Sequence, residues 1–239
     1  MRSEATRALR GRRLSRLIGA GFLTLACTVT AAQVGPSPQE VAAYRGLHAA
    51  AQTGDVSTLR KLSSQGADLQ ATDGHGRTAL HVATFARQRE AIRVLAAAGA
   101  DLNRRERDRY DAVTIAAVAD DEDTLRTLIR LGASARQVTS RYDGTALIAA
   151  AHLGHDGVVR QLIAAGAPLD HVNNLHWTAV IEAIVLGDGG PRHQATLKAL
   201  IDAGANLQLT DRHGQTPLAL ARSRGYTAMV ALLEKAGAR

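Results

Sequence analysis

The segment 188–193 holds the residues of this chain that could most directly bind a small ligand. Two adjacent glycines precede Pro191, a residue suited to the first turn of a helix. Backbone N–H groups at such a helix start, together with Arg192, could meet an anion. The alternative is a longer loop whose glycines only permit a sharp turn. We favour this alternative because loops tolerate insertions and nothing in the segment matches a phosphate-binding loop.

Glu182 lies just before this segment, at a position that is apolar in comparable stretches of the chain. Those stretches carry Val82, Ile115, Ala149 and Leu220. A buried carboxylate is costly unless it is paired or protonated, so we expect Glu182 to cap the nearby loop or pair with a base. A ligand contact is the alternative. The residues of this candidate ligand site are Glu182, Asp188, Gly189, Gly190, Arg192 and His193.

Metal and catalytic sites are not favoured by the other polar residues. Glu182, Asp188 and His193 lack the paired spacing of metal ligands, and no cofactor is expected. The nine histidines are scattered along the chain. No serine, histidine and acid form a recognisable set with a strained nucleophile turn. The sequence therefore predicts a protein that is not an enzyme.

The elements that must position these residues repeat along the chain. A Gly-Ala pair recurs, and its glycines are separated by 33, 33, 34, 38 and 33 residues. The pairs begin at Gly66, Gly99, Gly132, Gly166, Gly204 and Gly237. A period of about 33 residues indicates stacked helical units, each packed on its neighbours. Thr78 and Asp111 are expected to cap the first helix of their units. The gap of 38 residues places an insertion at 188–192.

The best-formed unit reads Asp73, Gly76, Arg77, Thr78, Ala79, Leu80, His81, followed by Gly99, Ala100 and Asp101. This pattern resembles the ankyrin repeat, as do the stretches 143–155 and 211–218. The resemblance implies an all-α solenoid of helix-turn-helix units with short β-hairpin fingers. It implies a structural role for His48 and His81, which hydrogen-bond the turn. The expected repeats are 41–72, 73–105, 106–139, 140–172, 173–210 and 211–239.

The resemblance also implies which residues face a protein partner, because ankyrin proteins bind through their finger tips and concave surface. Trp177, Tyr110 and Tyr142 would place scarce aromatic residues on this edge, where tryptophan, tyrosine and arginine are favoured. Packing of each aromatic on the adjacent finger is the alternative. The expected partner-binding residues are His75, Arg77, Arg107, Tyr110, Arg141, Tyr142, Leu175, Trp177, Arg212 and His213.

Residues 1–32 have the pattern of an export signal. A basic segment precedes the apolar run 17–26, which is too short to span a bilayer, and small residues follow. We expect cleavage after Ala32 and a periplasmic protein. Lipid attachment at Cys27 is the less favoured alternative, and Arg12 with Arg13 leaves the twin-arginine route open. Residues 33–40 are expected to be a linker kept extended by its prolines.

The charge of the chain gives no reason to expect a nucleic-acid partner. The first 16 residues contain six of its 29 basic residues and one of its 22 acidic residues, which leaves 23 against 21 in the remainder. Nucleic acid would call for a clustered basic face. We therefore expect a monomeric protein-binding module that is not inserted in a membrane. A small-ligand or ion receptor built on Glu182 and the 188–193 loop is the alternative.

Overall fold

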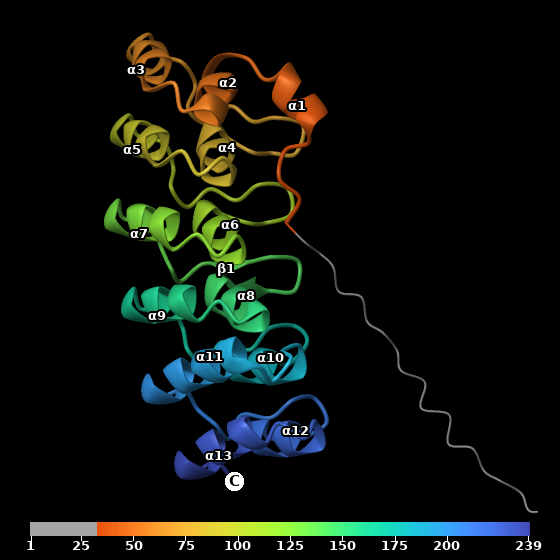
Figure 1. Cartoon of the computed structure of the whole chain (residues 1–239). Helices are drawn as coiled ribbons and strands as arrows, with labels where there is room; N and C mark the ends of the chain where they lie inside the picture. The colour runs from red at the N-terminus through yellow and green to blue at the C-terminus, as the bar shows by residue number, and fades with distance from the viewer. Residues whose placement is uncertain (1–32) are drawn as a thin grey trace, which may run out of the picture. The chain divides into compact units, whose positions relative to one another are not determined.

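A computed structural model describes residues 33–239, and the predicted export signal at 1–32 lies outside the described residues. The described unit runs from Gln33 to Arg239. It consists of paired helices stacked in two rows (Figure 1). The predicted all-α ankyrin fold is confirmed. None of the described helices is both long enough and apolar enough to cross a membrane.

The inner row is formed by the first helix of each unit. Each inner helix packs on the next one along the chain. The aligned helix starts follow from the cap residues: Thr78 and Asp111 precede α4 and α6 as expected. The inner helices are α2 (Gly46–Thr53), α4 (Ala79–Phe85), α6 (Ala112–Val118), α8 (Ala146–Leu153), α10 (Ala179–Val185) and α12 (Pro217–Ser223).

The outer row is formed by the second helices, and each leans on its own inner helix and on its outer neighbours. Leucines such as Leu95, Leu128 and Leu162 fill the space between the rows and are fully buried. These helices are α3 (Val56–Ser64), α5 (Arg89–Ala97), α7 (Glu122–Arg130), α9 (Asp156–Ala164), α11 (Pro191–Asp202) and α13 (Thr227–Lys235).

The recurring glycines explain the period of the sequence. All six Gly-Ala glycines follow an outer helix and have φ between 78° and 97°. A side chain is disfavoured in this left-handed region, so glycine is the natural residue at the end of each helix. The 188–192 insertion lengthens the fifth unit. Pro191 begins α11, as expected, and α11 has 12 residues where other outer helices have nine.

The fingers contain less strand than the ankyrin resemblance implies. Within residues 33–239, the ladder is a single antiparallel pair of β1 (Val138–Thr139) and β2 (Gly144–Thr145). The remaining fingers are closed by turn hydrogen bonds, such as Asp73 N to Arg77 O at 3.0 Å. The β1–β2 ladder also crosses the expected boundary between the third and fourth units at 139/140.

The predicted linker at 33–40 is wrong over its last three residues. A helix, α1 (Pro38–Ala43), begins there. Ser37 accepts a hydrogen bond from Glu40 N, and the Glu40 carboxylate accepts one from Ser37 N. Pro38 occupies the first helical turn, where its missing N–H costs nothing. This reciprocal capping turns a proline that was expected to extend the chain into the start of a helix.

Candidate functional site

The candidate site is the row of finger tips that projects beside the inner helices. We define the finger row as residues 73–77, 106–110, 139–145, 173–177 and 211–215. In four fingers, one polar side chain accepts backbone N–H bonds from the residues two and four positions later. In the third finger this residue is Ser140, which accepts from Tyr142 and Gly144. Asp73 accepts from His75 and Arg77, and Asn173 and Asp211 accept from the equivalent residues of their fingers. The tips are therefore fixed locally before any neighbour is considered.

Neighbouring fingers are also joined to one another. Arg107 N donates to His75 O at 2.9 Å, and Asn174 N donates to Tyr142 O at 3.0 Å. Ion pairs connect the second finger to the third. These pairs join Arg109 to Asp143 at 2.8 Å and Arg141 to Asp108 at 3.0 Å. Arg212 reaches Asn174 O from the last finger at 3.4 Å. The finger row is thus a continuous, preordered surface.

Most of the predicted partner-binding residues lie on this row with surface available to a partner. Arg107 has no carboxylate partner among the described residues. Burial raises the pKa of Tyr110 above its ordinary value, so its hydroxyl stays protonated. Trp177 packs partly against the core, so part of its surface has a structural role, and its packing on the adjacent finger stays a prediction. The exposed members are His75, Arg107, Arg141, Arg212 and His213, and the half-buried members are Tyr110, Tyr142, Leu175 and Trp177.

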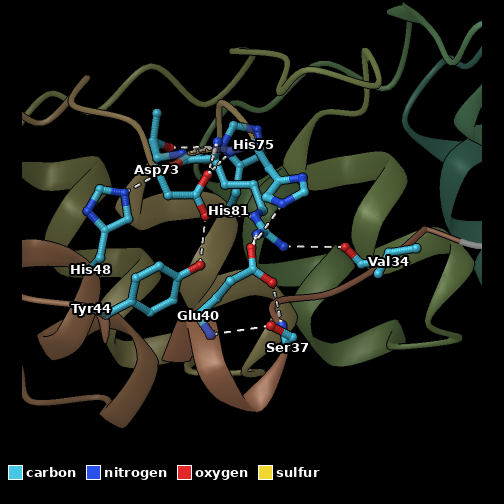
Figure 2. Close-up of polar contacts among 10 residues, drawn as sticks. Val34, Ser37, Glu40, Tyr44, His48, Asp73, His75 and His81 are labelled. Carbon is cyan, nitrogen blue, oxygen red and sulfur yellow. Dashed lines mark hydrogen bonds and ion pairs between the residues drawn. The ribbon is translucent and has the colours of Figure 1, made fainter. Parts of the chain in front are cut away.

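Arg77 corrects the prediction, because it does not present a free guanidinium. It is only 2% exposed. Its Nε donates to Asp73 Oδ2 at 2.8 Å, and its Nη2 pairs with Glu40 (Figure 2). Its backbone oxygen contacts His48 Nε2 at 2.9 Å. The charge of Arg77 is satisfied inside the protein, so this residue holds the first finger to the N-terminal helix.

His48 and His81 have the structural role that the resemblance implies. Thr78 N donates to His81 Nδ1 at 3.1 Å, and His81 Nε2 contacts Arg104 O at 3.0 Å. Because Nδ1 must accept, the proton resides on Nε2, which donates to the carbonyl. His81 therefore connects the helix start in its own unit to the next finger stem.

Glu182 is buried and paired, as expected for a structural carboxylate. It is 5% exposed. Asn173 Nδ2 donates to its Oε1 at 2.9 Å, and His152 Nδ1 lies 3.4 Å from its Oε2. Asn173 is also the residue that closes its own finger. Glu182 thus fastens the fourth finger of the row to α10 and α8, and does not cap the glycine loop.

The 188–193 loop is clamped between its neighbours. Asp188 Oδ1 accepts from Gly190 N at 2.8 Å and lies 2.8 Å from His193 Nδ1. Arg192 pairs with Asp120 at 2.8 Å. On the other side, Tyr226 donates to Gly187 O at 2.8 Å. These contacts occupy the Gly190 N–H and the Arg192 guanidinium, which an anion would need. The geometry therefore favours a structural role for the loop, and a ligand site there stays a prediction.

Two other features bear on small-ligand binding. Among residues 33–239, no three histidine, cysteine, aspartate or glutamate side chains converge to hold a metal ion. A hollow of about 500 Å³ lies between α9 and α11 in the outer row. Alanines such as Ala164, Ala195 and Ala199 line much of it, and no finger residue contributes. This hollow therefore lies away from the finger row.

Several functional contacts could not be found from the repeat pattern. The ion pair of Arg77 with Glu40 joins a finger to residues expected to be linker. A signal for it existed, because Ser37 and Glu40 have the spacing of a capping box and Pro38 suits a first helical turn. The pairing of Asn173 with Glu182 joins a finger to an inner helix. No local pattern predicts that contact.

The comparisons with known proteins agree with this architecture. The family model for ankyrin repeats (3 copies) matches residues 31–106 and 113–211. The chain is 36% identical over 190 residues to the ankyrin repeat protein YahD of Escherichia coli (strain K12), covering 79% of this chain and 94% of YahD.

Solved structures show the same fold. An ankyrin repeat domain from Acinetobacter baumannii AYE matches with a TM-score of 0.76 and 44% identity, covering 81% of this chain and 98% of that one. The human ASB11 ankyrin repeat domain, at 21% identity, has a TM-score of 0.67 over 82% of this chain and 85% of its own. With its stacked helix pairs, capped inner helices and linked fingers, the chain belongs to the ankyrin repeat family.

Proposed function

We propose that this protein is a non-enzymatic binding module that recognises another protein through its finger row and concave surface. Ankyrin repeats generally mediate protein–protein interaction. The observation that carries the proposal is the linked row of fingers, which exposes Arg107, Arg141 and Arg212 beside half-buried Tyr110 and Trp177. A preordered surface binds without a large ordering cost. Arginine and aromatic side chains are the residues most enriched among interface hot spots.

The site of action that we propose is the bacterial periplasm. The support is the basic segment, apolar run and small residues of positions 1–32. The mature N-terminus should then be Gln33, which sequencing of the purified protein from a periplasmic fraction would test. A lipid-modified Cys27 in that fraction would overturn cleavage after Ala32.

The binding proposal is tested by crosslinking in intact cells, followed by mass spectrometry of the captured protein. The purified partner is then titrated against single variants. Arg107→Glu and Trp177→Ala should each weaken binding at least tenfold, because both remove finger-row contacts. Arg130→Glu is the matched control, since Arg130 is exposed on α7, which lies in the outer row on the side away from the fingers (Figure 1).

Two outcomes decide the proposal. Loss of binding in Arg107→Glu with full binding in Arg130→Glu supports recognition by the finger row. Arg107→Glu is the decisive variant because the exposed side chain can change without loss of core packing, whereas Trp177 also contributes to the fold. Full binding by both finger variants would overturn the proposal.

A further inference from the structure

The N-terminal residues 33–43, which we call the strap, lie against the first finger and the end of α4. Val34 O accepts a hydrogen bond from Arg77 Nη1 at 3.4 Å. Gly35 backs onto the Phe85 ring, where a Cβ on Gly35 would lie 3.3 Å from Cδ1. Figure 2 shows Val34, Ser37 and Glu40 gathered beside the finger residues Asp73 and His75. The strap therefore covers part of the second unit.

Arg77 is the anchor of this contact. Its side chain is 3% exposed, and a buried guanidinium must be paired. Nε donates to Asp73, Nη1 donates to the Val34 carbonyl, and Nη2 pairs with Glu40. His75 Nε2 lies 3.1 Å from the same Glu40 oxygen. The finger thus offers a cationic receptor that the Glu40 carboxylate fills.

The position of Arg77 can be compared with the equivalent position in the later fingers. The residue before the helix cap is Arg77 in the second unit, and its equivalents are Tyr110, Gly144, Trp177 and Gln215. Gly144 is buried in the β1–β2 pair, and the other three are half-buried or exposed, whereas Arg77 is buried. Phe85 is half-buried, as are its equivalents Val118, His152 and Val185. The strap thus covers Arg77 at a position that three of the four later fingers leave at least partly open.

Apart from Val41, which packs against the core, the strap is held mainly by polar contacts. Helix α1 has six residues, and none of them is buried. Val34 is 79% exposed, so its side chain adds nothing to the attachment. The Glu40 carboxylate keeps 30% of its side-chain surface exposed. A segment that replaced the strap would need the same polar groups and an apolar residue in place of Val41.

We propose that the surface under the strap, formed by Arg77, His75 and Phe85, is a docking site for an acidic segment of a partner. Such a segment places a small residue on Phe85 and a carboxylate on Arg77, as the strap does now. The strap occupies the site until that segment displaces it. This inference rests on the proposed function, because the proposed occupant is a segment of a partner protein.

The test uses a fluorescent peptide copying residues 33–45 as the probe of the site. In the full chain, the double substitution Ser37→Ala with Glu40→Gln removes the capping box and the ion pair. Amide hydrogen exchange in α1 should then rise at least tenfold. The peptide should bind this variant at least tenfold more tightly than the wild type, and a peptide with glutamine in place of its glutamate should lose that binding. Glu90→Gln, which breaks an exposed pair with Arg93 on α5, is the control.

A second measurement does not depend on the variant. Excess peptide added to the wild type should accelerate amide exchange in α1 and leave exchange in α13 unchanged. The proposal is overturned if α1 exchange stays slow in the double variant, or if α1 is released and the peptide does not bind. Concentration-dependent dimerisation of the variant would assign the site to a second copy of the chain and would equally overturn it. None of these readouts uses the finger-row partner, so a failure here is separate from a failure of the proposed function.

Discussion

At the scale of single residues, His81 shows how the fold imposes a protonation state. It is fully buried, with Nδ1 accepting from Thr78 N and Nε2 donating to Arg104 O. Burial lowers the pKa of His81 from 6.5 to about 4, because a charged imidazolium is poorly solvated there. Protonation would also place a proton on the nitrogen that must accept. The neutral ring is therefore the folded form at neutral pH.

The stability of the protein should fall in mild acid because of His81. A base whose pKa is lower in the folded state contributes stability above its unfolded pKa and loses it as the pH falls. The loss should run from pH 6.5 toward pH 4 and reach about 3 kcal/mol. His81→Gln keeps an acceptor for Thr78 N in a capping-box arrangement and does not titrate. Urea unfolding at pH 7 and 4.5 should therefore show a smaller difference for His81→Gln than for the wild type. Exposed His213→Gln is the control, and equal pH dependence in all three proteins would contradict the assignment.

Ionised Asp111, unlike neutral His81, lowers the stability of the protein at neutral pH. It caps α6 through Oδ1, but its buried Oδ2 has no hydrogen-bond partner among the described residues. Burial raises its pKa, so folding favours the protonated acid and the ionised form destabilises the protein. Thr78 and Thr178 occupy the equivalent position in other units. Asp111→Thr should raise the free energy of unfolding at pH 7 by about 1 kcal/mol.

The gain from Asp111→Thr should shrink as the pH is lowered, because wild-type Asp111 becomes protonated and its burial penalty is relieved. Urea unfolding at pH 7 and 4 measures this difference. Asp55→Thr is the contrasting variant, since hydrogen bonds from Thr58 lower the pKa of Asp55 to about 2 and its ionised form is favoured. A stabilising effect of Asp55→Thr at pH 7, or none for Asp111→Thr, would show that burial does not govern these caps.

At the scale of the element, the ends of the helices depend on backbone conformation more than on side-chain contacts. Gly99 follows α5 with φ of 96°, and a Cβ placed on it would meet no heavy atom within 4 Å. Glycine is therefore favoured at this position only because the backbone is left-handed there. The same geometry ends every outer helix, which is why one dipeptide could reveal the repeat.

Gly99→Ala should lower the free energy of unfolding by about 1 kcal/mol, the cost of a side chain in the left-handed region. Gly74→Ala is a matched control, because Gly74 also has open space around it but does not have a positive φ. Thermal unfolding followed by circular dichroism would compare the two. Equal destabilisation by both substitutions would mean that the backbone conformation is not the cause.

Local sequence patterns predicted most of the helices of this protein. They could not predict the contacts between helices. Thr78, Asp111 and Pro191 marked helix starts because capping depends on residues three or four apart. Ser37 and Glu40 carried the same information, yet the neighbouring prolines favoured a linker. Arg192 pairs with Asp120, which is 72 residues away. That pairing depends on how three units stack, which no single window of sequence contains.

The finger row was predictable in position but not in detail. Its members follow from the resemblance to ankyrin repeats, since each finger leads directly into a capped inner helix. The burial of Arg77 was not predictable, because the burying group, Glu40, lies in a segment without repeat character. Glu182 was singled out by its charge at an apolar position. Its partner Asn173 could be identified only once the finger was placed beside α10.

At the scale of the whole described unit, stability should be distributed along the row. Inner and outer helices pack mainly on the preceding and following units. A solenoid of this kind gains stability from each unit and from each interface, so its ends can open without its centre. The clamp of Arg192 on Asp120 adds a connection that skips one unit. We therefore expect the third to fifth units to be the most cooperative part.

Leu128 and Leu233 allow a direct comparison of centre and end, because both are fully buried at equivalent positions of α7 and α13. Truncation of either to alanine leaves a cavity that should cost about 2–5 kcal/mol where the surroundings cannot relax. Leu128→Ala should lower the urea midpoint of the protein and speed amide exchange in α6 to α9. Leu233→Ala should speed exchange in α12 and α13 alone, because these helices have no later unit to hold them. Faster exchange of α4 in Leu233→Ala would show instead that all units unfold together, and the solenoid would then behave as one cooperative body.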